Sequence, residues 1–177
     1  LLEGVLDLSR IESGKMTLEE NDFDPRDLVQ QVLERHARDA YSKGLELACD
    51  CAGPLPQLLQ GDAGKLAQIV SNLVHNAVKF TAAGGVMVAI EGVPRGDDRC
   101  LLRVTVRDTG RGIAAPDRDR LFDAFTQLDT DGAERKGGVG LGLAISRRLA
   151  ESLGGMLTLE IAPERGSTFV IAIAFRV

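Results

Sequence analysis

The sequence has no tryptophan and few aromatic residues of any kind, which together make up 4% of the chain. Proteins that bind single-stranded nucleic acids stack the bases on aromatic side chains. The formal net charge at pH 7 is −5, whereas a nucleic-acid-binding surface is basic. Both deficits argue against nucleic acid as a partner.

Cysteine and histidine are also scarce, with three and two residues. These numbers provide neither a disulfide framework nor the suitably spaced ligands of a structural zinc site. Cys49 and Cys51 stand two residues apart in a strand-like run, so their side chains should point the same way. Reduced thiols are typical of a cytoplasmic protein, and we expect that location.

Long apolar runs are absent, because no stretch approaches the roughly 18 residues that a membrane-spanning helix needs. The 177 residues, 44% hydrophobic and 27% charged, instead predict one globular domain with a substantial core. Residues 1–15 have helical apolar spacing but are too few for a stable isolated helix. They predict the end of a longer helix whose bundle partners lie elsewhere, the alternative being a helix that packs on its own domain.

The remaining residues show three helical and six strand-like patterns. The helices are expected at 25–42, 62–80 and 140–153, and the strands at 16–24, 45–51, 86–93, 100–108, 155–162 and 167–175. Strands adjacent in sequence favour hairpins, above all between 86–93 and 100–108, and predict an α+β two-layer sandwich. The polar, glycine-rich segment 109–138 is as long as functional or disordered loops are.

The helix 62–80 places Asn72, Asn76 and Lys79 within about 60° of arc on one side. A solvated polar face is one interpretation of this pattern. However, asparagine is a middling helix former, and surface helices favour Glu, Lys and Arg. Two stacked amide oxygens suit a Mg²⁺ ion that keeps most of its waters and is held mainly by phosphates. Lys79 would add a positive charge for a phosphate oxygen.

The stretch DTGRG (108–112) follows the expected strand 100–108. An ionised Asp108 only accepts hydrogen bonds, so it suits the exocyclic amine of adenine and disfavours the carbonyl of guanine. Gly110 and Gly112 would let the chain turn and approach a flat base. The alternative is an ordinary Asp-Gly turn in a loop.

The stretch KGGVGLGLA (136–144) clusters glycines where a helix begins, although glycine is a poor helix former. A glycine-rich loop at a helix N-terminus presents free N–H groups to a phosphate. No strand directly precedes it, as a Rossmann loop requires, and the Gly-Lys-Ser/Thr ending of a Walker loop is absent. A tight turn without a ligand is the alternative.

The order of these motifs is more specific than any one of them. NLVHNAVKFT resembles the N box of bacterial histidine kinases, DTGRG the G1 box, LFDAF the F box, KGGVGLGLA the G2 box and GSTF the last glycine box. Residues from about 24 to 177 therefore resemble the catalytic and ATP-binding domain of these kinases, within the GHKL superfamily of gyrase, mismatch-repair and heat-shock ATPases. The resemblance implies the Bergerat fold, a mixed sheet covered by three helices, with ATP between the helices and a mobile lid at 126–137.

The resemblance also implies a division of the chain. LDLSRIESGKMTLE is similar to the end of the dimerisation helix of sensor kinases, especially hybrid ones. Residues 1–15 are then the C-terminal end of the dimerisation and phosphoacceptor helix, and residues 16–177 form the catalytic domain. The H box with its phosphoacceptor histidine is not found, and His36 and His75 match no such motif. We therefore expect no autophosphorylation by this stretch alone.

The residue roles follow from matching each box to the family pattern. The catalytic residues are Asn72, Asn76 and Lys79, of which Asn76 is the Mg²⁺ ligand and Lys79 a phosphate contact. Asp108 accepts from the adenine amine, Phe80 lies beside the base, and Phe125 packs between lid and site. The remaining ATP-binding positions implied by the resemblance are Gly110, Gly112, Ile113, Lys136, Gly138, Gly140, Leu141, Gly142, Leu143 and Thr168.

The implied activity is transfer of the γ-phosphoryl group of ATP to a histidine on a separate dimerisation domain. The implied partners are that domain, a response regulator or receiver domain downstream, and a second copy in the intact homodimer. The location is the cytoplasmic portion of a sensor kinase, whether or not a membrane anchors it. Two alternatives stay open. An ATP-driven clamp predicts a carboxylate four residues before Asn76, where Asn72 stands, and a degenerate scaffold predicts loss of Asp108, Asn76 or the glycines.

Overall fold

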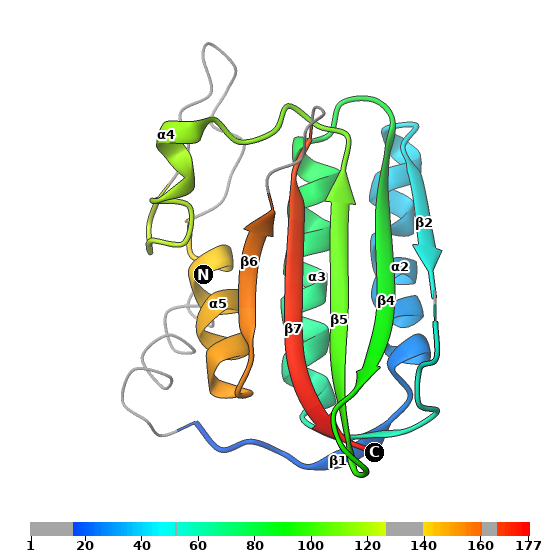
Figure 1. Cartoon of the computed structure of the whole chain (residues 1–177). Helices are drawn as coiled ribbons and strands as arrows, with labels where there is room; N and C mark the ends of the chain where they lie inside the picture. The colour runs from blue at the N-terminus through cyan, green and yellow to red at the C-terminus, as the bar shows by residue number, and fades with distance from the viewer. Residues whose placement is uncertain (1–15, 52, 127–139, 161–165) are drawn as a thin grey trace.

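The chain folds into two layers, a sheet and a layer of helices on one of its faces (Figure 1). The computed structural model describes residues 16–51, 53–126, 140–160 and 166–177, so the expected dimerisation helix at 1–15 and most of the expected lid lie outside it. The elements are β1 (Asn21–Phe23), α2 (Pro25–Ser42), β2 (Glu46–Asp50), β3 (Leu59–Gly61), α3 (Ala63–Phe80), β4 (Gly85–Pro94), β5 (Arg99–Asp108), α4 (Ala115–Arg118), α5 (Gly142–Ser152), β6 (Met156–Glu160) and β7 (Thr168–Arg176).

The sheet has seven described strands in the order β1-β3-β7-β5-β4-β2, with β6 also paired to β7. β2 runs parallel to β4, and the other pairs are antiparallel, so the sheet is mixed as expected. The predicted hairpin is confirmed, since β4 and β5 pair from Val86 and Asp108 to Pro94 and Cys100. β7 lies centrally, because it pairs with β5 along one side and with β6 and β3 along the other.

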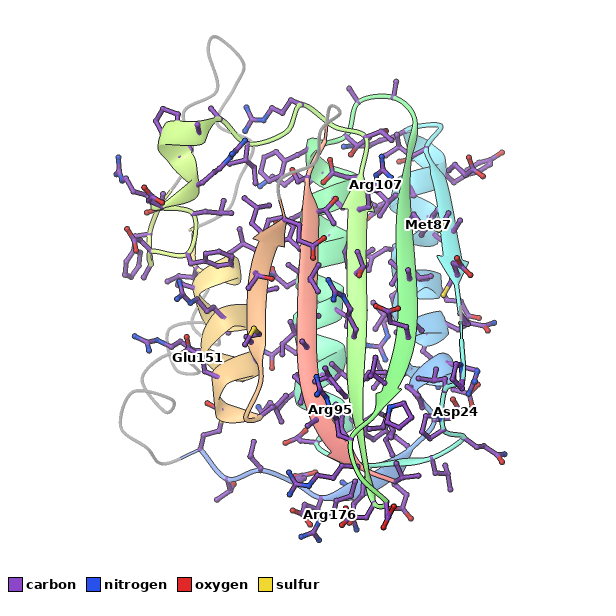
Figure 2. All side chains as sticks on the ribbon, viewed as in Figure 1. Asp24, Met87, Arg95, Arg107, Glu151 and Arg176 are labelled. Atoms are coloured by element: carbon purple, nitrogen blue, oxygen red, sulfur yellow. The ribbon has the colours of Figure 1, made fainter. Side chains whose placement is uncertain are left out.

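Helices α2, α3 and α5 cover one face of this sheet, which confirms the expected α+β sandwich (Figure 1). The apolar face of α3 packs against the sheet, and its members are buried, namely Leu66, Ile69, Val70, Leu73, Val74, Ala77 and Val78. The other face of the sheet carries alternate residues such as Met87 and Arg107, which are register partners on β4 and β5 (Figure 2). One-sided covering produces the period-2 alternation of β4 and β5.

Side-chain caps position the starts of α2 and α3. Asp24 accepts a hydrogen bond from the Arg26 N–H (2.8 Å) at the start of α2. Asp62 accepts from the Lys65 N–H (2.9 Å) at the start of α3. Because each cap satisfies a backbone donor that has no partner within its helix, these starts are well defined.

Several local expectations were wrong. The strand expected at 16–24 is reduced to β1, and β3, which pairs antiparallel with β1, lies where no strand was expected. Each of these three-residue strands buries a single side chain, Phe23 or Leu59, and three residues are too short for a periodic signal. The short helix α4 within 109–138 was not expected.

Two apolar residues of the predicted helices 25–42 and 62–80 are exposed. Ala37 of α2 is exposed, whereas Val29 and Ala40 are buried. Phe80 ends the apolar stripe of α3 in the sequence, yet its side chain is 45% exposed. Phe80 is the last residue of α3, so it extends beyond the sheet that the rest of the stripe covers.

Candidate functional site

Asp108 ends β5 with a buried carboxylate, only 7% exposed. The backbone N–H groups of Gly110 (2.8 Å) and Ser167 (3.3 Å) both donate to its Oδ1. Burial raises the pKa of Asp108, and the hydrogen bonds from Gly110 and Ser167 oppose that rise. The carboxylate is therefore held in one orientation, in surroundings where a hydrogen-bond acceptor is worth more than in water.

The turn after Asp108 is too crowded for side chains. A Cβ on Gly110 would lie 2.7 Å from the Phe80 carbonyl oxygen and 2.8 Å from Asp108 Oδ1. Gly112 has φ +75° and lies against the backbone of Gly166, which itself has φ +110° and touches the Asp108 backbone. The two glycine boxes therefore contact each other, although they are more than fifty residues apart in the sequence.

The C-terminal end of α3 lies beside this turn. The exposed ring of Phe80 contacts two cations, since Lys79 Nζ lies 5.1 Å and the Arg111 guanidinium carbon 5.3 Å from its centroid. Cation–π contacts of this kind hold a positive charge next to an aromatic face. Asn76 is half-buried, one turn before Phe80 on the same helix. Lys79, Phe80 and Asp108 thus lie in one neighbourhood, at the end of the sheet where β5 ends and β7 begins (Figure 1).

Asn72 contacts the first two turns of α5 rather than open solvent. Its Nδ2 donates to Ser146 Oγ (2.9 Å), and a Cβ on Gly142 would collide with its Oδ1. Gly142 therefore gives the Asn72 amide room beside the start of α5. This is a different reason from the phosphate approach that the sequence suggested for that glycine.

The start of α5 is also linked to the F box. Gly140 has φ +72°, and its carbonyl oxygen accepts from the Phe125 N–H (3.0 Å). Phe125 itself has φ +64°, the one non-glycine positive φ found in the described residues, and its side chain is 62% exposed. Leu141 is buried, and Leu143 is half-buried against the core. Leu141 and Leu143 thus anchor the start of α5 to the core.

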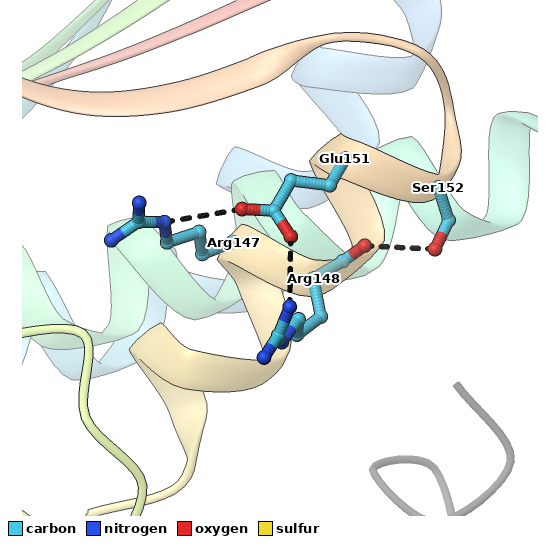
Figure 3. A network of polar contacts seen from close by, with 4 residues as sticks. All are labelled: Arg147, Arg148, Glu151 and Ser152. Carbon is cyan, nitrogen blue, oxygen red and sulfur yellow. Dashed lines mark hydrogen bonds and ion pairs between the residues drawn. The ribbon is translucent and has the colours of Figure 1, made fainter. Parts of the chain in front are cut away.

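The outer side of α5 carries an exposed charge network. Glu151 accepts from Arg147 Nε (3.2 Å) and Arg148 Nη1 (3.3 Å), and Ser152 Oγ donates to the Arg148 carbonyl oxygen (Figure 3). Exposed pairs of this spacing add only a few tenths of a kcal/mol each to helix stability. The guanidinium of Arg147 also lies 5.2 Å from the ring centroid of Phe122, which connects the F box to α5.

The other expected site residues are distributed as follows. Thr168 is buried at the start of β7 and pairs with Arg107 of β5, and Ile113 is half-buried against the core. Lys136 and Gly138 lie outside the described residues. Sequence reasoning missed Ser167 and Ser146, which hold Asp108 and Asn72. The GSTF box could have signalled Ser167, whereas nothing local singles out Ser146.

A cavity of about 690 Å³ lies between α2, α3 and α5, and Asn72 is among the residues that line it. It shares Asn72 and Gly142 with the expected site but does not include Asp108. His36 lines this cavity and hydrogen-bonds Ser71 Oγ through Nε2 (2.9 Å). Burial lowers the pKa of His36, and neighbouring His75 lowers it further. Both histidines line this cavity, which adjoins the expected site at Asn72 and Gly142.

Comparison with known proteins identifies the class to which this arrangement belongs. Residues 61–177 match the family described as histidine kinase-, DNA gyrase B- and HSP90-like ATPases. The signal transduction histidine-protein kinase BarA of Escherichia coli (strain K12) is 39% identical over 169 residues, which cover 96% of this chain and 18% of BarA. The chain belongs to this ATPase family and is a domain of the type found in sensor histidine kinases.

Other relatives agree with this assignment. The sensor protein GacS of Pseudomonas syringae pv. syringae is 39% identical over 173 residues, 98% of this chain and 19% of GacS. The crystal structure of full-length ShkA in complex with AMPPNP has a TM-score of 0.85 and 36% identity, over 98% of this chain and 35% of ShkA. The catalytic domain of histidine kinase ThkA, at 22% identity and a TM-score of 0.69, has the same fold over 88% of this chain and 97% of its own. The chain spans about a fifth of the length of the curated relatives.

None of the helices in the described residues combines the length and apolar character needed to cross a bilayer. In the same ranges, no cluster of three or more His, Cys, Asp or Glu side chains could hold a metal ion.

Proposed function

We propose that this domain binds ATP with Mg²⁺ and donates the γ-phosphoryl group to a histidine on a separate dimerisation domain. The observation that carries the proposal is the buried carboxylate of Asp108, oriented by Gly110 and Ser167 at the end of β5. A fixed, acceptor-only group in a turn that is too crowded for side chains suits the exocyclic amine of adenine. The AMPPNP present in the ShkA structure supports an adenine nucleotide as the ligand.

The residues fit a magnesium–triphosphate group. Asn76 would contribute a neutral amide oxygen to the ion, and Lys79 would contact a phosphate oxygen. The ion would neutralise charge on the transferred phosphoryl group. Gly140, with its positive φ, would let the backbone at the start of α5 approach the phosphates. The other expected ATP contacts, including Lys136 and Gly138, complete the proposal from the family pattern.

In this proposal Asn72 is a positioning residue and not a general base. Its amide is bonded to Ser146 and packed against Gly142, so it sets where α5 begins relative to α3. Asparagine has no basic carboxylate, and general-base assistance typically contributes about 10²–10⁴-fold to a rate. The domain should therefore hold ATP while hydrolysing it slowly, which preserves the phosphoryl group for a histidine.

The experiment combines two assays. The domain is mixed with radiolabelled ATP and a histidine-bearing dimerisation domain supplied in trans, and acid-labile phosphate on that partner is measured. Steady-state ATP hydrolysis is measured in parallel for the wild type and for Asn76→Ala. Phosphotransfer that is lost in Asn76→Ala, with slow hydrolysis, supports the kinase assignment. Rapid hydrolysis without any phosphotransfer would favour the ATP-driven clamp, and failure to bind ATP would favour a scaffold.

The proposed context follows from the relatives' names. We propose a homodimeric sensor kinase with a receiver domain or response regulator downstream, and the segment 1–15 as the end of its dimerisation helix. The names of BarA and GacS, a signal transduction histidine-protein kinase and a sensor protein, support this context.

A further inference from the structure

Lys43 follows the last residue of α2 and directs its side chain to the end of the neighbouring helix α3. Its Nζ donates to the carbonyl oxygens of Val78 (2.6 Å) and Lys79 (2.9 Å), which lie 35 and 36 positions further along the chain. The C-terminal ends of α2 and α3 lie at the same end of the sheet, where β5 also ends (Figure 1). One ammonium group therefore joins the ends of two helices.

The two bonds complete the carbonyl groups at the end of α3. The last four carbonyls of an α-helix have no partner within the helix. In α3 the first of them, that of Ala77, accepts from the Thr81 N–H (3.1 Å) and from Thr81 Oγ1 (2.7 Å). Lys43 supplies donors for the next two. The last, that of Phe80, faces the turn at Gly110, so two of the four depend on one side chain from another helix.

The last turn of α3 carries two residues of the expected ATP site, Lys79 and Phe80. Lys79 Nζ and the Arg111 guanidinium both lie against the Phe80 ring, so this turn also contacts the segment after Asp108. A cation at a helix C-terminus stabilises the last turn, because it compensates the negative end of the helix dipole. Without the ammonium the turn would fray more often, and Lys79 and Phe80 would leave their places beside Asp108.

We propose that Lys43 is a positioning residue for ATP binding, whose ammonium group caps α3 and holds Lys79 and Phe80 beside the Asp108 turn. The inference rests on the proposed binding of ATP, and Lys43 acts through α3 rather than by contact with the nucleotide. A ligand that needs an arrangement populated for only part of the time binds more weakly by that fraction. Loss of the cap therefore lowers ATP affinity, and bound ATP in turn holds the last turn of α3 in place.

The first experiment measures amide hydrogen exchange in the nucleotide-free domain. Lys43→Met keeps an unbranched side chain but removes the charge and the donors. We expect exchange at residues 79–81 to become about two- to tenfold faster, with unchanged exchange at 66–74 in the middle of α3. Lys65→Met, which removes an ammonium group from the first turn of the same helix, is the matched control and should change neither range. Exchange at 79–81 that stays at the wild-type rate in Lys43→Met overturns the cap.

The second experiment measures ATP affinity by calorimetric titration in the presence of Mg²⁺. We expect binding about two- to tenfold weaker in Lys43→Met, and unchanged binding in Lys65→Met. Lys43→Arg should restore the wild-type affinity to within about twofold, because a guanidinium keeps the charge and offers several donors. Lys43→Gln keeps two donors without the charge, should lie between these variants, and carries the test if Lys43→Met does not fold.

The outcomes separate this inference from the proposed function. Equal ATP affinity in the wild type and in Lys43→Met overturns the positioning role and leaves ATP binding intact. An arginine variant as weak as the methionine variant contradicts capping by a cation. A wild type that binds no ATP overturns the proposed function, and the positioning role with it.

Discussion

The substitution Asp108→Asn tests the proposed adenine contact with almost no change of shape. The Asn side chain keeps an oxygen that can accept from the Gly110 and Ser167 N–H groups, so the turn should persist. What changes is the charge, and one of the two acceptor oxygens becomes a donor. That donor would face the exocyclic amine of adenine, which is itself a donor.

The expected loss of affinity can be bounded. A hydrogen bond to a charged group contributes about 1.5–3 kcal/mol, which corresponds to a loss of about 10- to 150-fold in ATP affinity. The preference for ATP over GTP should shrink as well, because an amide can satisfy a carbonyl acceptor.

Asp108→Asn should weaken ATP binding but stabilise the folded domain. Burial raises the pKa of Asp108 in the folded state, so the stability it contributes is fully present below the ordinary pKa of 3.8 and is lost as pH rises through the raised value. Asn does not titrate and carries no buried charge. We therefore expect Asp108→Asn to unfold at a higher temperature than the wild type at neutral pH, with a smaller dependence of stability on pH above 3.8.

Two measurements on the same protein check these expectations. Calorimetric titration gives the ATP and GTP affinities, and thermal unfolding across pH gives the stability. Asp119→Asn, which removes an exposed carboxylate after α4, is the charge-matched control and should leave both unchanged. Equal ATP affinity in wild type and Asp108→Asn would refute the adenine assignment. Lower stability at neutral pH would refute the idea that this charge is buried at a cost.

Three further predictions concern other parts of the site. Gly142→Ala should displace the Asn72 amide from Ser146, at a cost of about 1 kcal/mol in a denaturant titration and with weaker ATP binding; unchanged stability would contradict this contact. Phe125→Asn should raise the free energy of unfolding by up to about 1 kcal/mol, because Asn tolerates the left-handed backbone better and the lost ring is exposed; a loss of stability would show that the ring packs. The pKa of His36 is lowered from 6.5, so its contribution to stability is present above that pH and lost as pH falls through the lowered value; His36→Gln should flatten unfolding profiles below pH 6.5, and parallel profiles would contradict this.

The fold class followed from local signals in the sequence. Asp24 and Asp62 mark helix starts because a short carboxylate caps free N–H groups, whatever the rest of the chain does. The alternation of β4 and β5 indicated strands covered on one side, and their short connection indicated a hairpin. The motif order from the N box to GSTF identified the family, which comparison confirmed. These signals need only neighbouring residues, so tertiary structure adds little to them.

The tertiary structure decided which residues act together. Ser146 holds Asn72 across 74 positions of sequence, and Ser167 holds Asp108 across 59, and no local pattern shows either pair. The phosphate-loop signal at Gly142 concealed its steric role against Asn72, and the apolar stripe of α3 suggested burial for Phe80, which is exposed. The sequence by itself determined the class of protein and the positions of its motifs, because caps, periodicity and motif spacing are local. The roles of these individual side chains depend on contacts between distant segments, and only the packing of α3, α5 and the two glycine turns could decide them.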